Sequence, residues 1–375
     1  QGGEEWTRFW NAFGSILKEG VIEDHEQRER IASLLRFAST ASDDDAPTVG
    51  LDEVRLSFSF NEGMITMDKT KLAALREKYV DHAPESEGRD EYVVPYAGLP
   101  TFLQMPHQSE LQDIDIALIG VPFDLGVYNR AGARFGPRAI RNVSLFGSMN
   151  HHSKIEPCTL CRITDVGDVH ITHRYNLDQG IRDIEAYYHR VLDAGILPLS
   201  AGGDHSITHP ILRAVGRDHP VGLVHVDAHC DTGPGMGKSE FYHGAPFRNA
   251  VLDGVLDPER TVQIGIRGPS EPVWEFSYDS GMTVIHIEEF VEMGVDQVIQ
   301  KAREVVGDGP TYISFDVDGL DPAYAPGTGT PEVGGLTTRE AQALIRGLRG
   351  LNLVGGDVVE VAPQYDPTTN TARVG

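Results

Sequence analysis

The chain has 375 residues, of which 40% are hydrophobic and 23% are charged, and its formal net charge at pH 7 is -24. These proportions are typical of a globular protein with a large core, and the acidic balance excludes the basic face that nucleic-acid binding requires. No apolar stretch approaches the roughly 20 residues that span a bilayer, and the first residues lack the basic and apolar regions of a secretion signal. We therefore expect a cytoplasmic protein without a nucleic-acid or membrane partner.

Residues 1–92 differ from the rest of the chain. Apolar residues from Trp6 to Phe37 have helical spacing, a polar break follows at 42–47, and residues 84–91 are polar and acidic. An apolar stripe of this kind is more often a packing surface than a cofactor site. We interpret residues 1–92 as a partly helical N-terminal extension that takes part in assembly or covers a pocket.

From residue 113 onward, apolar runs alternate with amphipathic segments. The runs lie at Ile114–Val121, Ile196–Leu199, Val221–Val226, Thr261–Ile266, Met282–Ile287, Thr311–Phe315 and Leu353–Val361. The segments between them include Leu177–Ala194, Val295–Val306 and Thr338–Leu348. Apolar runs separated by helices indicate a parallel sheet covered on both faces. We predict that residues 93–375 form one α/β domain, a three-layer α/β/α sandwich with a mainly parallel sheet.

The three cysteines do not make a recognisable site. Cys158 and Cys161 form a C-x-x-C, which can be a redox pair or half of a zinc site. No second C-x-x-C exists and the flanking residues are typical of a loop, so we interpret the pair as structural. Cys230 lies between two candidate ligands, where its side chain should point to the other face of the chain. So few cysteines favour a reducing compartment.

Three short motifs, each just after an apolar run, carry the strongest functional signal. They are Gly202-Gly203-Asp204-His205-Ser206, Asp227-Ala228-His229-Cys230-Asp231 and Ser314-Phe315-Asp316-Val317-Asp318-Gly319-Leu320-Asp321-Pro322. Ligands gather at the carboxyl ends of strands in an open α/β sheet. Imidazole nitrogen and carboxylate oxygen suit divalent first-row metals. Two histidines with surplus aspartates are enough for two ions that share carboxylates and activate water, so the motifs predict a hydrolase.

The spacing within the motifs explains how the ligands converge. Alternate residues of an extended segment point the same way, which brings together Asp227, His229 and Asp231. Asp316 and Asp318 repeat this arrangement after another strand. Any one motif alone could be a strand end with capping aspartates, but three in one chain are hard to explain in that way.

The sequence also resembles the ureohydrolase family, which includes arginases, agmatinases and other hydrolases of guanidino compounds. The likeness runs from about Val94 to the end of the chain. Besides the three motifs, it rests on Gly120-Val121-Pro122-Phe123-Asp124, Gly132-Ala133-Arg134-Phe135-Gly136-Pro137-Arg138, His243-Gly244-Ala245-Pro246-Phe247 and Pro326-Gly327-Thr328-Gly329-Thr330-Pro331-Glu332. The resemblance favours the agmatinase-like branch. It implies the α/β/α fold of arginases and deacetylases and a homo-oligomer, a trimer or hexamer.

The resemblance also implies roles for individual residues. One metal ion would be held by His205, Asp227, Asp231 and Asp316, and the other by Asp227, His229, Asp316 and Asp318, with Asp227 and Asp316 bridging the two. Glu360 would bind the substrate guanidinium, a task suited to a planar, bidentate ion pair. His243 and Asp318 would carry protons to the leaving amine. No ligand of the pattern is missing, so we expect an active enzyme that releases urea.

The substrate loops point away from arginine. Loop 232–242 lacks the asparagine and small hydroxyl residues with which arginases hold the amino-acid head group. The N-terminal extension and loop 268–278 resemble those of guanidine hydrolases, which tend to use nickel where most relatives use manganese. Guanidine is a small cation without a tail and needs a closed pocket. Trp274, Phe241 and Thr101 would line that pocket, the two aromatic rings through cation–π contacts.

We therefore expect guanidine as the substrate, with 4-guanidinobutanoate, 3-guanidinopropanoate and then agmatine as alternatives. A carboxylate-tailed substrate would need a cation such as Arg267 or Lys238 at the pocket mouth. The alternative from a different functional class is a non-catalytic partner subunit, which should have lost ligands. A single-zinc deacetylase would show fewer aspartates. Relatives usually continue into a last helix beyond the position of Arg373, so we expect that a C-terminal piece is missing.

Overall fold

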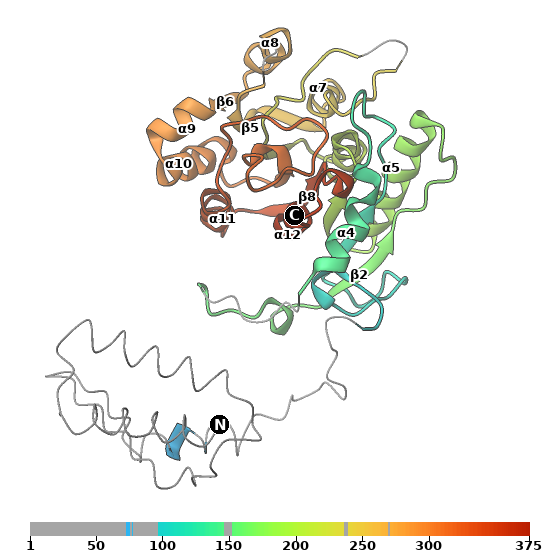
Figure 1. Ribbon diagram of the computed structural model, residues 1–375. Coiled ribbons are helices and arrows are strands. Elements are labelled where there is room, and N and C mark those ends of the chain that lie inside the picture. The colour runs from blue at the N-terminus through green and yellow to red at the C-terminus, as the bar shows by residue number, and fades with distance from the viewer. Residues whose placement is uncertain (1–72, 76, 78–96, 146–151, 236–238, 269–270) are drawn as a thin grey trace, which may run out of the picture. The chain divides into compact units, whose positions relative to one another are not determined.

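The computed structural model of the chain describes residues 73–75, 77, 97–145, 152–235, 239–268 and 271–375 (Figure 1). The chain divides into two compact units, Gln1–Tyr92 and Val93–Gly375. The helix expected within Trp6–Phe37 lies outside the described residues, so the role of the N-terminal extension stays a prediction. The fold is therefore that of the second unit, from residue 97 onward.

An eight-stranded sheet forms the centre of this unit, in the order β2-β1-β3-β8-β7-β4-β5-β6. Its strands are β1 (Ile116–Val121), β2 (Ile163–Asp168), β3 (Leu197–Gly202), β4 (Val221–Val226), β5 (Leu256–Ile266), β6 (Thr283–His286), β7 (Thr311–Asp316) and β8 (Leu353–Val359). Every pairing between neighbouring strands is parallel. The predicted parallel sheet is confirmed, and each strand except β2 overlaps a predicted apolar run.

The missed strand, β2, lies at one edge of the sheet. Its sequence carries Asp165 at a position that is only 1% exposed. The Arg141 guanidinium compensates for this burial, because its Nε donates to Asp165 Oδ2 at 2.8 Å. The backbone N–H of Phe102 donates to the same oxygen at 2.9 Å. A buried ion pair here takes the place of apolar side chains, so hydrophobic periodicity could not reveal the strand.

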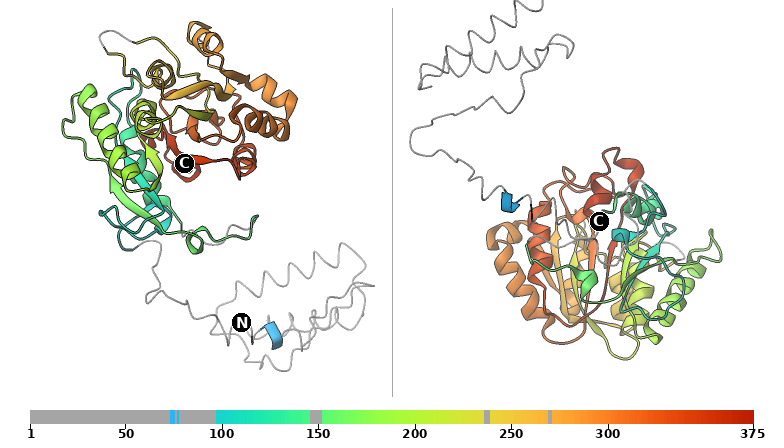
Figure 2. Two further views of the ribbon diagram at one scale, coloured as in Figure 1. Left: turned by 180° about the vertical axis from the view of Figure 1, so that it is seen from behind. Right: turned by 90° about the horizontal axis from the view of Figure 1, so that it is seen from below.

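Helices cover both faces of the sheet, as Figure 2 shows from two further directions. The α-helices are α4 (Gly136–Val143), α5 (Leu177–Asp193), α6 (Thr208–Val215), α7 (Pro246–Leu252), α8 (Glu271–Ser280), α9 (Ile287–Met293), α10 (Val295–Val306), α11 (Thr338–Gly347) and α12 (Asn370–Val374). The short 3₁₀-helices are η3 (Phe102–Gln104), η4 (Ala133–Phe135), η5 (Pro157–Thr159), η6 (His205–Ile207), η7 (Val317–Gly319) and η8 (Pro363–Tyr365). None of the helices in the described part of the chain has the length and apolar character to cross a membrane.

The core is split into two layers by the alternation of side chains along the strands. In β1, Ala117, Ile119 and Val121 join a buried cluster with residues of α5, α6 and α7. Leu118 joins a second cluster, to which α4, α9, α10 and α11 contribute. Successive side chains of a strand point to opposite faces, so a strand buried on both sides is apolar throughout. The predicted α/β/α sandwich is confirmed.

Four neighbouring strands carry the candidate ligands. β3, β8, β7 and β4 lie side by side at the centre of the sheet and run in the same direction. Their carboxyl ends therefore meet at one edge, where open α/β sheets bind ligands. His205 follows β3, Glu360 follows β8, Asp227 follows β4, and Asp316 is the last residue of β7. The sheet order thus gathers residues that are far apart in the sequence.

Candidate active site

The first group of ligands, which we call the inner position, consists of His205, Asp227, Asp231 and Asp316. Its donor atoms all lie within 4.8 Å of one another. His205 Nδ1 lies 2.8 Å from Asp231 Oδ2, 3.2 Å from Asp227 Oδ2 and 3.4 Å from Asp316 Oδ2. All four residues are buried. The inner position therefore offers one nitrogen and three carboxylate oxygens to a common centre.

A second group, the outer position, shares Asp227 and adds His229 and Asp318. His229 Nδ1 lies 3.1 Å from Asp318 Oδ2 and 3.4 Å from Asp227 Oδ1. The two oxygens of Asp227 thus face different positions, Oδ2 the inner one and Oδ1 the outer one. This is the arrangement expected of a carboxylate that bridges two ions.

Asp316 joins only the inner of these two groups. Its Oδ1 accepts the backbone N–H of Asp318 at 2.8 Å and so begins η7, while its Oδ2 faces His205. The bridging role that the resemblance implied for Asp316 stays a prediction.

The tautomer of His205 suits a metal ligand. Ser314 Oγ donates its only proton to Asp357 Oδ1 at 2.7 Å, so it must accept the proton of His205 Nε2, 2.8 Å away. His205 Nδ1 is then unprotonated. Although it lies close to Asp231, it has no hydrogen bond of acceptable geometry and is fully buried. Its lone pair is left for a metal ion, and its orientation is fixed by the other ring nitrogen.

The crowding of carboxylates also fits cations. Burial and the negative charges of Asp318 and Asp227 raise the pKa of Asp316 well above its usual range. Burial and the charge of Asp227 raise the pKa of Asp318 to about 6. Carboxylates that are buried together stay ionised when cations are bound among them. The residues present therefore fit a binuclear centre of divalent ions, with hard oxygen donors and imidazole nitrogen as its ligands.

Glu360 and His243 lie together beside the inner position. Glu360 Oε1 accepts from the backbone N–H of His205 at 3.0 Å and lies 2.9 Å from His243 Nδ1. Burial lowers the pKa of His243, but the charge of Glu360 and its hydrogen bond raise it to about 9. The other polar atoms of the pair, Glu360 Oε2 and His243 Nε2, are buried without a hydrogen-bond partner. Glu360 Oε2 can therefore accept a hydrogen bond from a ligand, and His243 Nε2 can donate a proton to one.

Two residues of the site adopt left-handed backbone conformations. The φ angle is 50° at Asp231 and 64° at Glu360. For residues other than glycine, such conformations cost about 1–3 kcal/mol each and persist only where the surroundings enforce them. At Glu360 the backbone N–H donates to Gly203 O at 2.9 Å, which fixes the turn after β8. The backbone is thus strained where it aims a carboxylate into the site.

Tyr128 is a residue of the site that the sequence analysis missed. The backbone N–H of His243 donates to Gly126 O at 3.1 Å, and the N–H of Gly126 donates to Asp204 Oδ2 at 2.8 Å. These bonds tie the loop after β1 to the site. The Tyr128 ring centroid lies 5.1 Å from that of His243, although the residue is 63% exposed. No spacing in the sequence marks a single loop tyrosine, so only the fold reveals it.

The three residues expected to close a pocket make other contacts. The Trp274 ring lies 4.9 Å from His286. The Phe241 ring stacks on that of His209, with 5.6 Å between the ring centroids. Thr101 Oγ1 donates to Met105 O at 2.8 Å. The structure does not bring these side chains into the hydrogen-bonded group around Glu360, and their substrate-binding role stays a prediction.

Arg267 and Lys238 were the cations considered for a carboxylate tail. Arg267 Nη2 donates to Asp318 O and to Glu332 O, each at 2.7 Å. Its guanidinium thus holds the backbone around the outer position together. Lys238 lies outside the described residues. The described Cys158, Cys161 and Cys230 form no disulfide with one another, and Cys230 is buried.

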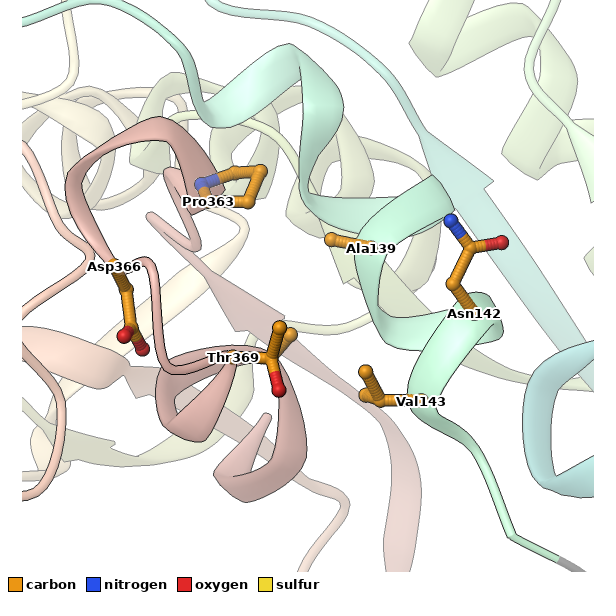
Figure 3. A pocket seen from close by; sticks show the side chains of 7 residues that line it. Ala139, Asn142, Val143, Pro363, Asp366 and Thr369 are labelled. Atoms are coloured by element: carbon orange, nitrogen blue, oxygen red, sulfur yellow. The ribbon is translucent and has the colours of Figure 1, made fainter.

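A separate hollow lies between α4 and the C-terminal segment (Figure 3). It is lined by Ala139, Asn142, Val143, Pro363, Asp366, Thr369 and Ala372. Its one carboxylate is occupied, because Asp366 Oδ1 accepts from Thr368 and Asp366 Oδ2 accepts from Thr371. Both oxygens of this carboxylate are therefore engaged, whereas Glu360 Oε2 has no hydrogen-bond partner.

Known proteins resemble this chain along most of its length. The sequence matches the Arginase family over residues 114–375. It is 54% identical over 286 residues to a guanidinopropionase from Pseudomonas aeruginosa, which covers 75% of this chain and 89% of the relative. It is 48% identical over 289 residues to a mitochondrial agmatinase from Gallus gallus, which covers 76% of this chain and 85% of the relative.

Among solved structures, proclavaminate amidino hydrolase from Streptomyces clavuligerus has a TM-score of 0.73 at 40% identity, covering 75% of this chain and 95% of that chain. Residues 1–53, which lie outside the described part of the chain, match the Hsp90 protein family.

Proposed function

This chain belongs to the arginase family, and from that premise we propose that its substrate is a short guanidino acid, with 3-guanidinopropanoate as the first candidate. The expected class of enzyme, a metal-dependent ureohydrolase acting on guanidino compounds, is confirmed by the family. The observation that supports a guanidino substrate is the pair of buried atoms without partners, Glu360 Oε2 and His243 Nε2. The length of the tail is proposed from the 54% identity to a guanidinopropionase.

The side chains around Glu360 suggest how the substrate is held. Glu360 Oε1 is already engaged by His205 N and His243, so Oε2 is the atom free to accept N–H groups of a guanidinium. A carboxylate and a planar cation form a directional, charge-assisted pair. The buried carboxylate therefore orients the guanidino carbon toward the ligands of the two metal positions.

His243 is suited to protonate the leaving nitrogen. With a pKa of about 9, its imidazole is protonated at neutral pH, and Nε2 carries a proton that no protein group accepts. A positioned acid of this kind contributes about 10²–10⁴-fold to the rate. When bound, the two divalent ions would supply Lewis acidity and lower the pKa of water. The products are urea and the amine of the substrate tail.

Two tyrosines can receive a carboxylate tail. The ring centroids of Tyr128 and Tyr242 lie 5.1 Å and 6.3 Å from that of His243. Burial raises the pKa of Tyr242 to about 12, so its phenol stays a proton donor at neutral pH. Phenol O–H groups donate to carboxylates. A guanidino acid uses these donors, whereas guanidine, favoured by the sequence analysis, has no tail to reach them.

The metal and the assembly belong to the same proposal. Donors of this type accept both manganese and nickel, and raw affinity does not decide which ion a protein holds in the cell. We propose manganese first, nickel second, and a trimer or hexamer of identical subunits. Light scattering of the purified protein measures the assembly directly, and a monomer would exclude the oligomer.

The test is urea release by protein loaded separately with Mn²⁺ and Ni²⁺. We expect kcat/KM to be highest for 3-guanidinopropanoate, then 4-guanidinobutanoate, with agmatine and guanidine lower. Guanidine or agmatine in first place would overturn the guanidino-acid proposal while leaving the enzyme class intact. Glu360→Gln is the matched control, because it keeps the side-chain shape and should lower the activity toward every substrate.

A further inference from the structure

Two buried polar residues beside the metal ligands have no role in the function derived above. They are His225 on β4 and Gln263 on β5, and both are 0% exposed. The two strands are neighbours, and His225 and Gln263 are paired in their register. Polar side chains buried in a sheet core cost free energy unless they are hydrogen-bonded.

The hydrogen bonds of Gln263 determine which way its amide points. One amide atom lies 2.6 Å from the backbone carbonyl of Cys230 and 3.1 Å from His225 Nδ1. A carbonyl oxygen only accepts, so this atom is the nitrogen Nε2, and it donates to both. His225 Nδ1 therefore accepts a hydrogen bond and carries no proton.

The proton of His225 then belongs to Nε2, which lies 2.8 Å from Asp227 Oδ2. The same carboxylate oxygen faces the inner position, 3.2 Å from His205 Nδ1. The Phe247 ring packs against His225 with a centroid distance of 4.3 Å and holds the imidazole in place. The chain from Gln263 through His225 thus ends on the oxygen that Asp227 turns toward the inner ion.

We propose that Gln263 and His225 are positioning residues for the shared carboxylate Asp227, and that they set the affinity of the inner metal position. Gln263 fixes the tautomer of His225, and His225 fixes the orientation of Oδ2. This inference concerns metal binding and does not depend on which guanidino compound is the substrate. It also explains a cost, because Gln263 Oε1 is left buried without a partner. Residues chosen for packing alone would avoid that loss.

The test compares His225→Phe and Gln263→Met, which keep shape but remove donors, with His225→Gln, which can place an amide N–H near the position of Nε2. Mn²⁺ binding to the metal-free full chain is measured by calorimetry, and the melting temperature of the metal-free protein is measured alongside. We expect His225→Phe and Gln263→Met to lower the affinity for Mn²⁺ at the affected position by about 10–100-fold. His225→Gln should stay within about threefold of the unchanged protein.

The two positions are separated by repeating the change in two backgrounds. With His229→Ala, which leaves the inner position, His225→Phe should still weaken Mn²⁺ binding. With His205→Ala, which leaves the outer position, it should have little further effect. Unchanged Mn²⁺ affinity together with a lower melting temperature of the metal-free protein would overturn the proposal in favour of a purely structural pair. Equal weakening in both backgrounds would overturn the assignment to the inner position.

Discussion

The inner and outer metal positions share Asp227 but differ in depth. His205 at the inner position is 0% exposed, whereas the His229 side chain at the outer position is 26% exposed. His205 is held by Ser314 and, through it, Asp357, both buried. At the outer position, Asp318 Oδ2 is held by Thr330 Oγ1 at 3.0 Å. From this difference we expect the buried, hydrogen-bonded inner position to hold its ion more tightly than the outer position.

The largest expected effect comes from removing the residue common to both positions. Asp227→Ala deletes the oxygens that face both ions, so we expect binding of both ions to be lost and urea release to fall by roughly 10⁴-fold or more. Elemental analysis of dialysed protein gives the metal content. Asp321→Ala is the control, since Asp321 accepts from Ala323 N and Gly334 N in a turn. Retention of two ions in Asp227→Ala would contradict the assignment of Asp227 to both positions.

Glu360 lies beside the inner position, and its carboxylate contacts the inner ligand His205 only at the backbone N–H. Glu360→Gln keeps the shape of the side chain but removes the charge that pairs with a guanidinium. We expect kcat/KM to fall by about 10²–10³-fold while the metal content stays at the level of the unchanged protein. Loss of metal in Glu360→Gln would instead assign Glu360 to the support of the inner position.

The depth difference itself is tested by removing one nitrogen ligand at a time. His229→Ala should leave the inner ion bound and reduce the content to about one ion per subunit. His205→Ala should lower the affinity for the first ion more strongly, because the buried position loses its only nitrogen. Competition with a chelator followed by metal analysis orders the two variants. Tighter metal retention in His205→Ala than in His229→Ala would contradict the assigned depths.

A pH profile examines the proton donor. The pKa of His243 is raised to about 9, above its usual 6.5, so the protonated form persists through neutral pH and is lost as the pH rises through about 9. We expect kcat/KM, which reports the free enzyme, to be level just below that pH and to fall above it. The falling limb should disappear in His243→Asn, whose lower activity should no longer follow this titration. A limb that survives unchanged in the variant would assign the titration to another group.

The smallest expected effect comes from changing the exposed residue Tyr128. Tyr128→Phe removes one phenol donor and keeps the ring against His243. A single hydrogen bond to a charged group is worth about 1.5–3 kcal/mol, so kcat/KM for 3-guanidinopropanoate should fall at least tenfold while that for guanidine changes little. Equal losses for both substrates would mean that Tyr128 supports His243 rather than the substrate tail.

The sequence was enough to single out the candidate ligands, because they lie close together in the chain. Asp227, His229 and Asp231 follow one strand, and Asp316 and Asp318 lie at the end of another. The expected alternation of an extended segment does not hold in detail, because Asp231 is left-handed and Asp318 lies in η7. The apolar runs determined the parallel sheet, since strands buried on both faces must be apolar throughout. The resemblance supplied Glu360 and His243, which no local pattern distinguishes from other acids and histidines near strand ends.

Only the tertiary structure decided the contacts that depend on strand order and register. The Arg141–Asp165 pair hid β2. Tyr128 meets His243 because Gly126, in the loop after β1, is hydrogen-bonded to His243 and Asp204. His225 and Gln263 are 38 residues apart and meet because β4 and β5 pair in one register. Periodicity records which face a side chain occupies, but not which strand lies next to it. The sequence thus identifies the carboxylates, and the pairing of strands in the sheet sets the hydrogen bonds that orient them.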